Sequence, residues 1–455
     1  MRKIPLFIGT LSTESLNVDG QNIALLSDEE LEVMTEEADA AKAEGDANLG
    51  EVERFIDVTD TMQDVADTLE SNGESMGEDV TPAEAALVDA SAQAAVAGTA
   101  TPNEEIMPVM ESYVGQNRRL AVESIREKAS QLYEAVIKFL KKVWENIEKF
   151  AYKYIGEIPL LRRKLDALKT RVEETASKSL KKEGGRSFKI TSGTGVLMSD
   201  TQPIKDNAAL QAVLATTETM ATYVFGTYAD NVKKRGDSLV DAISDFDADK
   251  ADEAGAAAMK ELAATRFNVP GTSTNDSRFS GYDCEVAAGM MSNKSLARRT
   301  WKDRSEKGLA AGLNRMRFNS VLMVSTVEKP KDPPADITFT TLSTPEMSKV
   351  ISKIEKLLDV AEQFRRGSKF KQLKDVREKM KNASSKATTN MRKLESEENR
   401  TQANIHATAI YKEMINLNVG FADWVKNPIE PMVQLTMSSA RAAMMVVSRS
   451  CSQYE

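Results

Sequence analysis

The most regular pattern in the chain is an apolar stripe in its second quarter. Its members recur every three or four residues, with Lys and Glu on the other face: Ile125, Ala129, Leu132, Val136, Phe139, Val143, Ile147, Phe150 and Tyr154. This spacing is typical of one face of an α-helix. Gly156 and Pro159 interrupt it, and apolar residues resume it over 160–172. We therefore predict a long amphipathic helical hairpin over residues 113–178.

The last third of the chain, residues 345–455, is also predicted to be helical. A helix start is indicated by Ser343-Thr344-Pro345-Glu346, which supplies a cap residue, a proline in the first turn and an acid. The apolar stripe that follows ends at Gly367, a suitable residue for a helix end. Further helices fit residues 369–396, 400–426 and 430–450. Pro428 and Pro431 separate the last two of these helices.

The region between them, residues 184–344, is less regular and contains the best strand candidates. Phe188-Lys189-Ile190-Thr191 alternates between apolar and polar residues. Arg317–Val327 and Asp336–Thr340 resemble a β-hairpin with a long, proline-containing loop. Two helices fit residues 206–234 and 238–265. Because strands interrupt the helices without alternating with them, we predict an α+β fold that is predominantly α-helical, with a small antiparallel β element.

Charge divides the chain near residue 110. Residues 1–110 contain 4 Lys and Arg against 25 Asp and Glu, a net charge of −21, whereas residues 111–455 have a net charge of +12. The acidic part contains only two aromatic residues, Phe7 and Phe55. Such a composition buries too little apolar surface to offset chain entropy. We predict marginal helices near Leu25–Met34 and Val52–Leu69.

The predicted organisation therefore has four parts. Residues 1–110 form an acidic, largely disordered leader or a targeting or masking segment, and residues 111–183 form the helical hairpin. Residues 184–344 form the mixed α+β region, and residues 345–455 form the C-terminal helical region. Residues 111–455 together are called the basic body below. Charge asymmetry of this kind is typical of chains that have a nucleic-acid partner and an acidic tail.

Two clusters of basic residues lie in the basic body. Residues 365–393 contain eleven Lys and Arg against two acids, and a second cluster surrounds Trp301. Clusters like these bind nucleic acid by releasing counterions, without sequence preference. The alternative interpretation is that they are solvated helix faces. The candidate contacts are Arg298, Arg299, Lys302, Arg304, Arg365, Arg366, Lys369, Lys371, Lys374, Arg377, Lys379 and Lys381.

The sequence lacks an arrangement of residues that indicates catalysis. The single histidine, His406, lies within a helical pattern, and Cys284 and Cys451 are far apart and have no zinc-site spacing. There is no phosphate-binding loop or nucleophile-elbow motif. No stretch approaches the ~18 apolar residues of a membrane span. We expect a non-enzymatic protein with no cofactor, no metal ion and no small-molecule substrate.

The segment Ala121-Val122-Glu123-Ser124-Ile125, continuing through Val143-Trp144-Glu145-Asn146-Ile147 to Ile158-Pro159-Leu160-Leu161, follows the acidic leader. This order of parts resembles the internal head (inner-body) proteins of phiKZ-like giant tailed phages. The resemblance implies an acidic propeptide that targets the protein into the growing prohead. It also implies a prohead protease that cuts after Glu in motifs of the form small residue, any residue, Glu.

Two glutamates are the main candidates for this cleavage. Glu123, in Ala121-Val122-Glu123, matches the motif best, whereas Glu111, in Val109-Met110-Glu111, lies at the charge boundary but has Val in place of a small residue. The motif also occurs at Ser12-Thr13-Glu14 and Ser27-Asp28-Glu29.

The resemblance implies a virion structural protein packaged inside the capsid with double-stranded DNA, which it contacts non-specifically. Its other expected partners are head proteins and the prohead protease. Its expected location is the interior of the phage head, and the host cytoplasm during assembly. Two alternatives stay open: an uncleaved scaffold or coiled-coil interaction protein, and a membrane-active protein that uses Leu120–Tyr154 as an interfacial helix.

Overall fold

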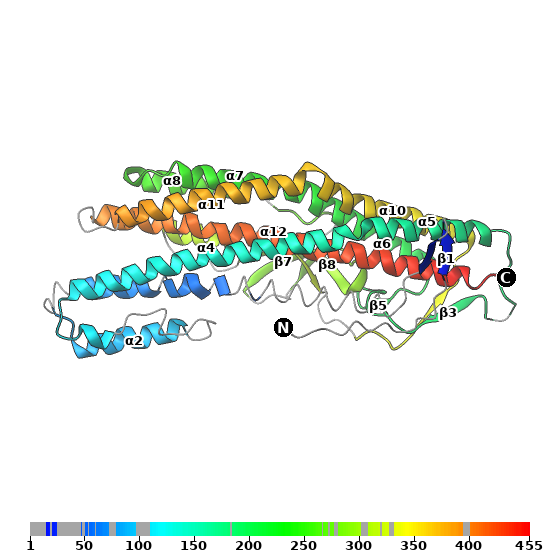
Figure 1. The fold of residues 1–455 in the computed structure, drawn as a ribbon, viewed down its shortest axis with the longest axis horizontal. Coiled ribbons are helices and arrows are strands. Elements are labelled where there is room, and N and C mark those ends of the chain that lie inside the picture. The colour runs from blue at the N-terminus through cyan, green and yellow to red at the C-terminus, as the bar shows by residue number, and fades with distance from the viewer. Residues whose placement is uncertain are drawn as a thin grey trace.

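The computed structural model is an elongated bundle of long helices lying side by side, with small sheets on one side of it (Figure 1). It describes the following residues: 15–18, 21–24, 47, 51–52, 54–59, 61–71, 79–96, 110–182, 184–265, 267–271, 274–276, 281–301, 308–318, 321–326, 332–394 and 401–455. Most of these residues are helical, and the sheets are antiparallel. The predicted fold class, predominantly α-helical α+β, is confirmed.

A single helix of 50 residues, α12 (Gln402–Cys451), runs through the centre of the bundle. Most of its side chains from Met414 to Val447 are buried, because other elements cover it on every side. The predicted separation of two helices at Pro428 and Pro431 is wrong. Proline lacks the N–H that a helix needs, but the hydroxyl of Tyr228 donates to the carbonyl of Trp424 at 2.6 Å. That carbonyl is the one that residue 428 would otherwise satisfy.

Among the described residues of the basic body, eight further helices surround α12. They are α4 (Arg118–Gly156), α5 (Ile158–Thr175), α6 (Asn207–Tyr223), α7 (Ala229–Ser244), α8 (Ala251–Ala264), α9 (Leu309–Phe318), α10 (Thr344–Arg366) and α11 (Ser368–Leu394). A π-helical turn, Val224–Tyr228, joins α6 to α7 without a break. The predicted boundary between residues 234 and 238 is therefore wrong. The chain breaks instead after Ser244, where the Asp247 side chain caps a short 3-10 helix, Ala248–Lys250.

The helices α4 and α5 do not form the predicted hairpin. Their contacts with α12 advance in the same direction: the Trp144 ring lies 5.6 Å from Phe421, and Arg171 donates to Ser448. The two helices therefore run end to end, parallel to α12 (Figure 1). The single residue between them, Glu157, has helical dihedral angles. Pro159 lies in the first turn of α5, where its missing N–H costs no helical hydrogen bond.

The apolar stripe of the sequence does form the buried face of α4. Its described members Ile125, Ala129, Leu132, Val136, Val143 and Ile147 are all buried in the main core. The side chains of Phe139, Phe150 and Tyr154 lie outside the described residues.

The start of α10 is confirmed, because Ser343 and Glu346 form a capping box there. At its end the N–H of Gly367 donates to the carbonyl of Gln363 at 2.7 Å. A Cβ at position 367 would lie 2.4 Å from the same oxygen, so only glycine fits this tight joint to α11. Further along, α11 packs on α7 (Figure 1).

The largest described sheet has four antiparallel strands in sequential order: β6 (Thr274–Asp276), β7 (Tyr282–Val286), β8 (Lys294–Trp301) and β9 (Val321–Thr326). β10 (Ile337–Thr340) pairs instead with β3 (Ser187–Ile190), which places Phe339 opposite Phe188. The three predicted strands correspond to β3, β9 and β10, although Arg317 belongs to α9. β6, β7 and β8 were not predicted, and the predicted hairpin of β9 with β10 is wrong. The buried rings of Phe188 and Phe339, 5.7 Å apart, favour the observed pairing. Two short pairs complete the described strands: β1 (Ser15–Val18) with β2 (Gln21–Ala24), and β4 (Met198–Ser199) with β5 (Gln202–Pro203).

The acidic part of the chain contributes helices to the bundle. Residues 51–52, 54–59 and 61–71 are helical, and α2 spans Pro82–Val96; together these are called the acidic helices. A short 3-10 helix, η1 (Met110–Tyr113), precedes α4. The acidic helices lie beside the first half of α4 (Figure 1). Their buried side chains, together with Val80 just before α2, belong to the same core as those of α4: Val52, Phe55, Ile56, Val58, Met62, Ala66, Leu69, Ala85 and Val88.

The expectation of a largely disordered leader therefore does not hold for these residues. Composition alone indicated too little apolar surface, but the apolar residues recur at helical spacing and are buried against α4. Burial against another part of the chain offsets the entropy that an isolated segment could not. The predicted helix near Val52–Leu69 is present, and the one near Leu25–Met34 lies outside the described residues.

Candidate functional site

The first basic cluster begins at the end of α10 and continues along α11, where several of its members face the neighbouring helices. Lys374 and Arg377 converge on Glu148 of α4, at 3.2 and 2.8 Å. The Arg377 guanidinium also lies 5.5 Å from the centre of the Trp144 ring. These two partly buried cations therefore hold α11 against α4.

Other lysines of the same helix bind α7. Lys369 pairs with Asp230, and Lys379 pairs with Asp237 at 3.2 Å. Burial raises the pKa of Asp237, but hydrogen bonds from Lys233 and Lys379 outweigh it, so that the pKa is lowered overall. Arg366 pairs with Glu362 on its own helix. Much of the cluster therefore forms ion pairs that hold α11 against α4 and α7.

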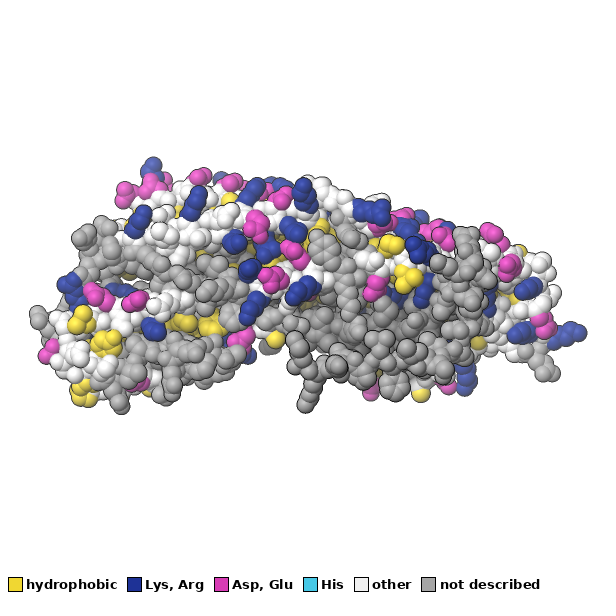
Figure 2. Space-filling model, viewed as in Figure 1, with side chains coloured by type: hydrophobic (Ala, Val, Ile, Leu, Met, Phe, Trp, Pro, Cys, Tyr) yellow, Lys and Arg dark blue, Asp and Glu magenta, His cyan; other side chains and the backbone are white. Residues whose placement is uncertain are grey.

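Two candidate contacts of the first cluster, Lys371 and Lys381, are accessible at the surface. Lys371 is exposed, and Lys381 is half-exposed beside Glu378, at 3.8 Å. On the face shown in Figure 2, basic side chains alternate with acidic ones along the upper helices and do not form a continuous basic surface. The side chain of Arg365 lies outside the described residues.

The second basic cluster belongs to β8 and the segment after it. Arg298 donates to Glu285 of β7 at 2.5 Å and to the carbonyl of Phe267 at 3.0 Å. The Arg299 guanidinium lies 5.2 Å from the centre of the Tyr282 ring. Both arginines therefore contact the surrounding sheet. The candidate contacts Lys302 and Arg304 lie outside the described residues.

The acidic helices meet the basic body at Arg118, the first residue of α4. Its guanidinium binds both carboxylate oxygens of Glu84, at 2.5 and 3.1 Å. It also donates to the carbonyls of Leu69 and Asp79, each at 3.1 Å. The Arg118 and Glu84 side chains are 5% and 9% exposed, so this ion pair is buried.

Glu84 also organises the start of α2. Its carboxylate accepts hydrogen bonds from the N–H and the hydroxyl of Thr81, both at 2.9 Å, in a capping-box arrangement. The hydrogen bonds from Arg118 and Thr81 outweigh the effect of burial and lower the pKa of Glu84 to about 2. The carboxylate is therefore fully ionised at neutral pH. Thr81-Pro82-Ala83-Glu84 has the capping-box signature, which could have predicted the role of Glu84 at the start of α2, but no motif marks Arg118.

About two turns further along α4, Arg126 binds two more acids. Its guanidinium lies 2.9 Å from Asp67 and 3.0 Å from Glu70. The Arg126 side chain is mostly buried, whereas the two carboxylates are half-exposed. Three carboxylates of the acidic part therefore bind two arginines of the basic body.

The two candidate cleavage residues lie in different structures. Glu111 lies in η1, directly after residues 97–109, which are outside the described residues. Glu123 lies in the second turn of α4, where its exposed side chain pairs with Arg119 at 3.4 Å. Proteases cut most readily where the backbone is not held by helical hydrogen bonds. Glu111 lies in a 3-10 helix of four residues and Glu123 in an α-helix of 39 residues, so fewer helical hydrogen bonds hold the backbone at Glu111. This difference favours Glu111, although Glu123 matches the motif better.

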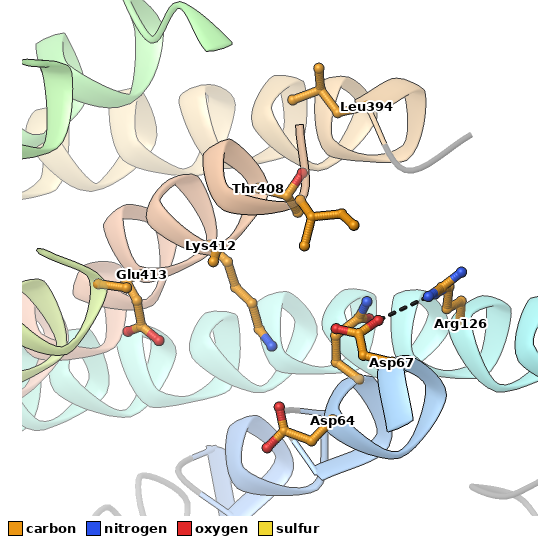
Figure 3. A pocket seen from close by; sticks show the side chains of 11 residues that line it. Asp64, Asp67, Arg126, Leu394, Thr408, Lys412 and Glu413 are labelled. Atoms are coloured by element: carbon orange, nitrogen blue, oxygen red, sulfur yellow. Dashed lines mark hydrogen bonds and ion pairs between the residues drawn. The ribbon is translucent and has the colours of Figure 1, made fainter. Parts of the chain in front are cut away.

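A cavity of about 280 Å³ lies where the acidic helix of residues 61–71 meets α4, α9, α11 and α12. Figure 3 shows Lys412 reaching from α12 toward the acidic helix that carries Asp64 and Asp67. The lining is completed by Gln63, Arg126, Thr408, Glu413 and apolar side chains. Acids and bases are mixed in this cavity, which is typical of a polar seam between helices.

The described residues show no constellation for metal chemistry: none of their His, Cys, Asp and Glu side chains gather in threes that could bind an ion. His406 is exposed, and its Nε2 lies 2.8 Å from Asp252, which ties α12 to α8. Cys284 and Cys451 are buried thiols. Within the part of the chain that the structure covers, no helix has both the length and the apolarity needed to span a bilayer.

Comparison with known proteins gives one family. A family model of phiKZ-like phage internal head proteins matches residues 27–449, which include the acidic helices as well as nearly all of the basic body. No curated protein and no solved structure matches the chain. Because the match extends over most of the sequence, the chain belongs to the phiKZ-like phage internal head proteins.

Proposed function

We propose that this chain is a non-enzymatic structural protein of the phage head interior whose acidic N-terminal segment is removed by the prohead protease during assembly. The remaining basic body then packs among double-stranded DNA and other head proteins. Before assembly the full chain is in the host cytoplasm. The proposal is supported by the change of charge at residue 110, across which Glu84, Asp67 and Glu70 bind Arg118 and Arg126.

The physical reason is competition between anions. Carboxylates of the acidic segment neutralise arginines that phosphates could otherwise bind, and they lower the net charge of each copy. Removal of residues 1–111 leaves a chain with a net charge of +13. Such a chain binds packed DNA by counterion release, without sequence preference.

Mass spectrometry of the protein from native particles tests the cleavage. We expect peptides that begin at Ser112, the residue after Glu111, and few peptides from residues 1–100. Peptides that begin at Ser124 would assign the cut to Glu123 instead. Peptides covering residues 1–100 at normal abundance would exclude the cleaved leader.

Salt dependence tests the contact with DNA. Binding should weaken steeply as the salt concentration rises, and Lys371→Ala or Lys381→Ala should each lower the slope by about one counterion. Lys349→Ala removes the same charge from α10, outside both clusters, and serves as the matched control. Binding that does not weaken with salt would contradict this mechanism.

A second candidate function is an uncleaved scaffold or interaction protein of the head. Two observations favour it: the acidic helices share the main core, and α11 uses many of its cations within the molecule. The same mass-spectrometry experiment separates it from the first candidate. The membrane-active alternative is disfavoured because the described part of the Leu120–Tyr154 stripe is mostly buried in the core.

A further inference from the structure

The boundary between the acidic helices and the basic body has the properties of a binding interface. We infer that the acidic segment is a folded ligand of the basic body, so that a single cut at the boundary does not release it. The biological meaning of this inference rests on the proposed cleavage, but the interface itself does not depend on it.

The first support is the position of Arg118. From the body side, its guanidinium contacts both parts of the acidic segment, namely the end of the first acidic helix at Leu69 and the start of α2 at Asp79 and Glu84. A bidentate, buried Arg–carboxylate pair of this kind is a strong and geometrically specific contact. Arg118 therefore joins three pieces of structure at once.

The backbone adds a second set of contacts at the same place. The N–H of Val80 donates to the carbonyl of Gln116 at 3.1 Å, and the N–H of Gly115 donates to the carbonyl of Val80 at 3.0 Å. Asp79 and Asn117 form a further antiparallel bridge. These bonds cross from the acidic segment to residues that follow Glu111.

Apolar burial supplies the third set. Phe55, Ile56 and Leu69 of the acidic segment are at most 3% exposed and belong to the same core as Ile125 and Leu132 of α4. Separation would expose all of these side chains to water, which is unfavourable in proportion to their apolar area.

All of these contacts join residues on opposite sides of the proposed cut. The last acidic partner in these contacts is Glu84, and the body partners begin at Val114, so cleavage after Glu111 breaks none of them. Cleavage after Glu123 would differ, because Arg118 would leave with the acidic fragment. After a cut at Glu111, unfolding or digestion of the acidic segment is needed before Arg118 and Arg126 can bind another partner.

A site-specific protease tests this inference on the full chain. Its recognition sequence replaces residues 99–105, and the protein is cut at neutral pH and passed through a size-exclusion column. We expect the fragment and the body to elute together, and to separate only in denaturant. Elution of the fragment apart from the body directly after cutting would overturn the inference.

Matched variants identify the contacts that retain the cut acidic fragment on the body. Arg118→Ala should increase the dissociation rate of the cut fragment at least tenfold, whereas Arg119→Ala, which removes the neighbouring exposed arginine, should leave it unchanged. Arg126→Ala provides a milder variant if Arg118→Ala does not fold. Equal retention in the Arg118→Ala, Arg126→Ala and Arg119→Ala proteins would overturn the role of the ion pairs.

The outcome is independent of the proposed function. Full-length protein in native particles would exclude the cleaved leader and leave this binding result standing. Rapid loss of the cut fragment would overturn the inference and leave cleavage in the particle untouched.

Discussion

Tyr228 and Pro428 show how one side chain makes a proline acceptable inside a buried helix. Pro428 cannot donate to the carbonyl of Trp424, and a buried carbonyl without a donor is costly. The Tyr228 hydroxyl supplies the missing donor, and burial of this hydroxyl raises the Tyr228 pKa well above its ordinary value. The tyrosine is therefore protonated at neutral pH and acts as a donor there.

Replacement of this donor should lower stability in a way that depends on residue 428. We expect Tyr228→Phe to reduce the free energy of unfolding by about 2 kcal/mol, because the Trp424 carbonyl loses its partner. In a Pro428→Ala background the loss should be smaller, since the alanine supplies a backbone N–H. Urea unfolding of the four proteins of this cycle measures the coupling. Equal losses in both backgrounds would contradict the assignment.

Glu84 makes the stability of the boundary depend on pH. Its pKa in the folded chain is about 2, below the ordinary value of 4.5, chiefly because of the hydrogen bond from Arg118. The folded state therefore binds the proton less tightly than the unfolded state. The stabilisation is complete above pH 4.5 and is lost as the pH falls from there toward 2.

The corresponding variant is Glu84→Gln, which removes the charge and leaves the buried Arg118 without its counter-ion. We expect a loss of about 3 kcal/mol at pH 7, and a smaller difference from the wild type as the pH falls below 4.5. Thermal unfolding across this pH range measures it. Glu123→Gln, at an exposed ion pair, should change stability by no more than about 0.5 kcal/mol. A pH-independent difference for Glu84→Gln would argue against ionised Glu84.

Among the elements, α7, α11 and α12 approach one another closely at Gly236. A Cβ at this position would lie 2.5 Å from Val376 of α11 and 2.7 Å from Phe421 of α12. The ion pairs of α11 with Asp230 and Asp237 lie along the same contact. Much of the basic cluster that the sequence assigned to nucleic acid thus serves the packing of α11 against its neighbours.

A methyl group at Gly236 should separate these helices. We expect Gly236→Ala to lower the free energy of unfolding by about 2 kcal/mol through overpacking, although alanine favours helix formation. Gly226→Ala is the matched control, because no atom lies within 4 Å of a Cβ there. Its stability should equal or exceed that of the wild type. Chemical denaturation distinguishes the two, and equal stability of both variants would contradict the close approach.

At the scale of the whole molecule, the acidic helices and the basic body share one core. Their net charges are opposite, yet the boundary is built from buried apolar side chains as well as ion pairs. The leader of the sequence-based prediction is, in its described part, a member of the bundle. Its removal would change the folded core and not only the charge.

Phe55→Ala tests this directly. We expect a loss of about 3–5 kcal/mol in the unfolding of the full chain, since Phe55 is 1% exposed in the core. Leu87→Ala, at a side chain of α2 that is 62% exposed, should have little effect. A Phe55→Ala protein as stable as the wild type would show that the acidic helices contribute nothing to the fold.

The sequence by itself determined the fold class and the elements that have a regular local pattern. The stripe from Ile125 to Ile147, the cap at Ser343 and the strand at 187–190 depend on local periodicity and capping, which neighbouring residues specify. It also determined the charge reversal near residue 110, and its order of parts indicated the family.

Only the tertiary structure decided how these elements meet. The continuity of α12 through Pro428 depends on Tyr228, a residue from a distant part of the sequence, and the pairing of β10 with β3 depends on a similarly distant phenylalanine contact. The folding of the acidic helices depends on α4. The role of Arg118 follows from its buried position in the folded chain, and no sequence motif marks it. These outcomes are set by contacts between distant residues, whose free energies a local pattern does not contain.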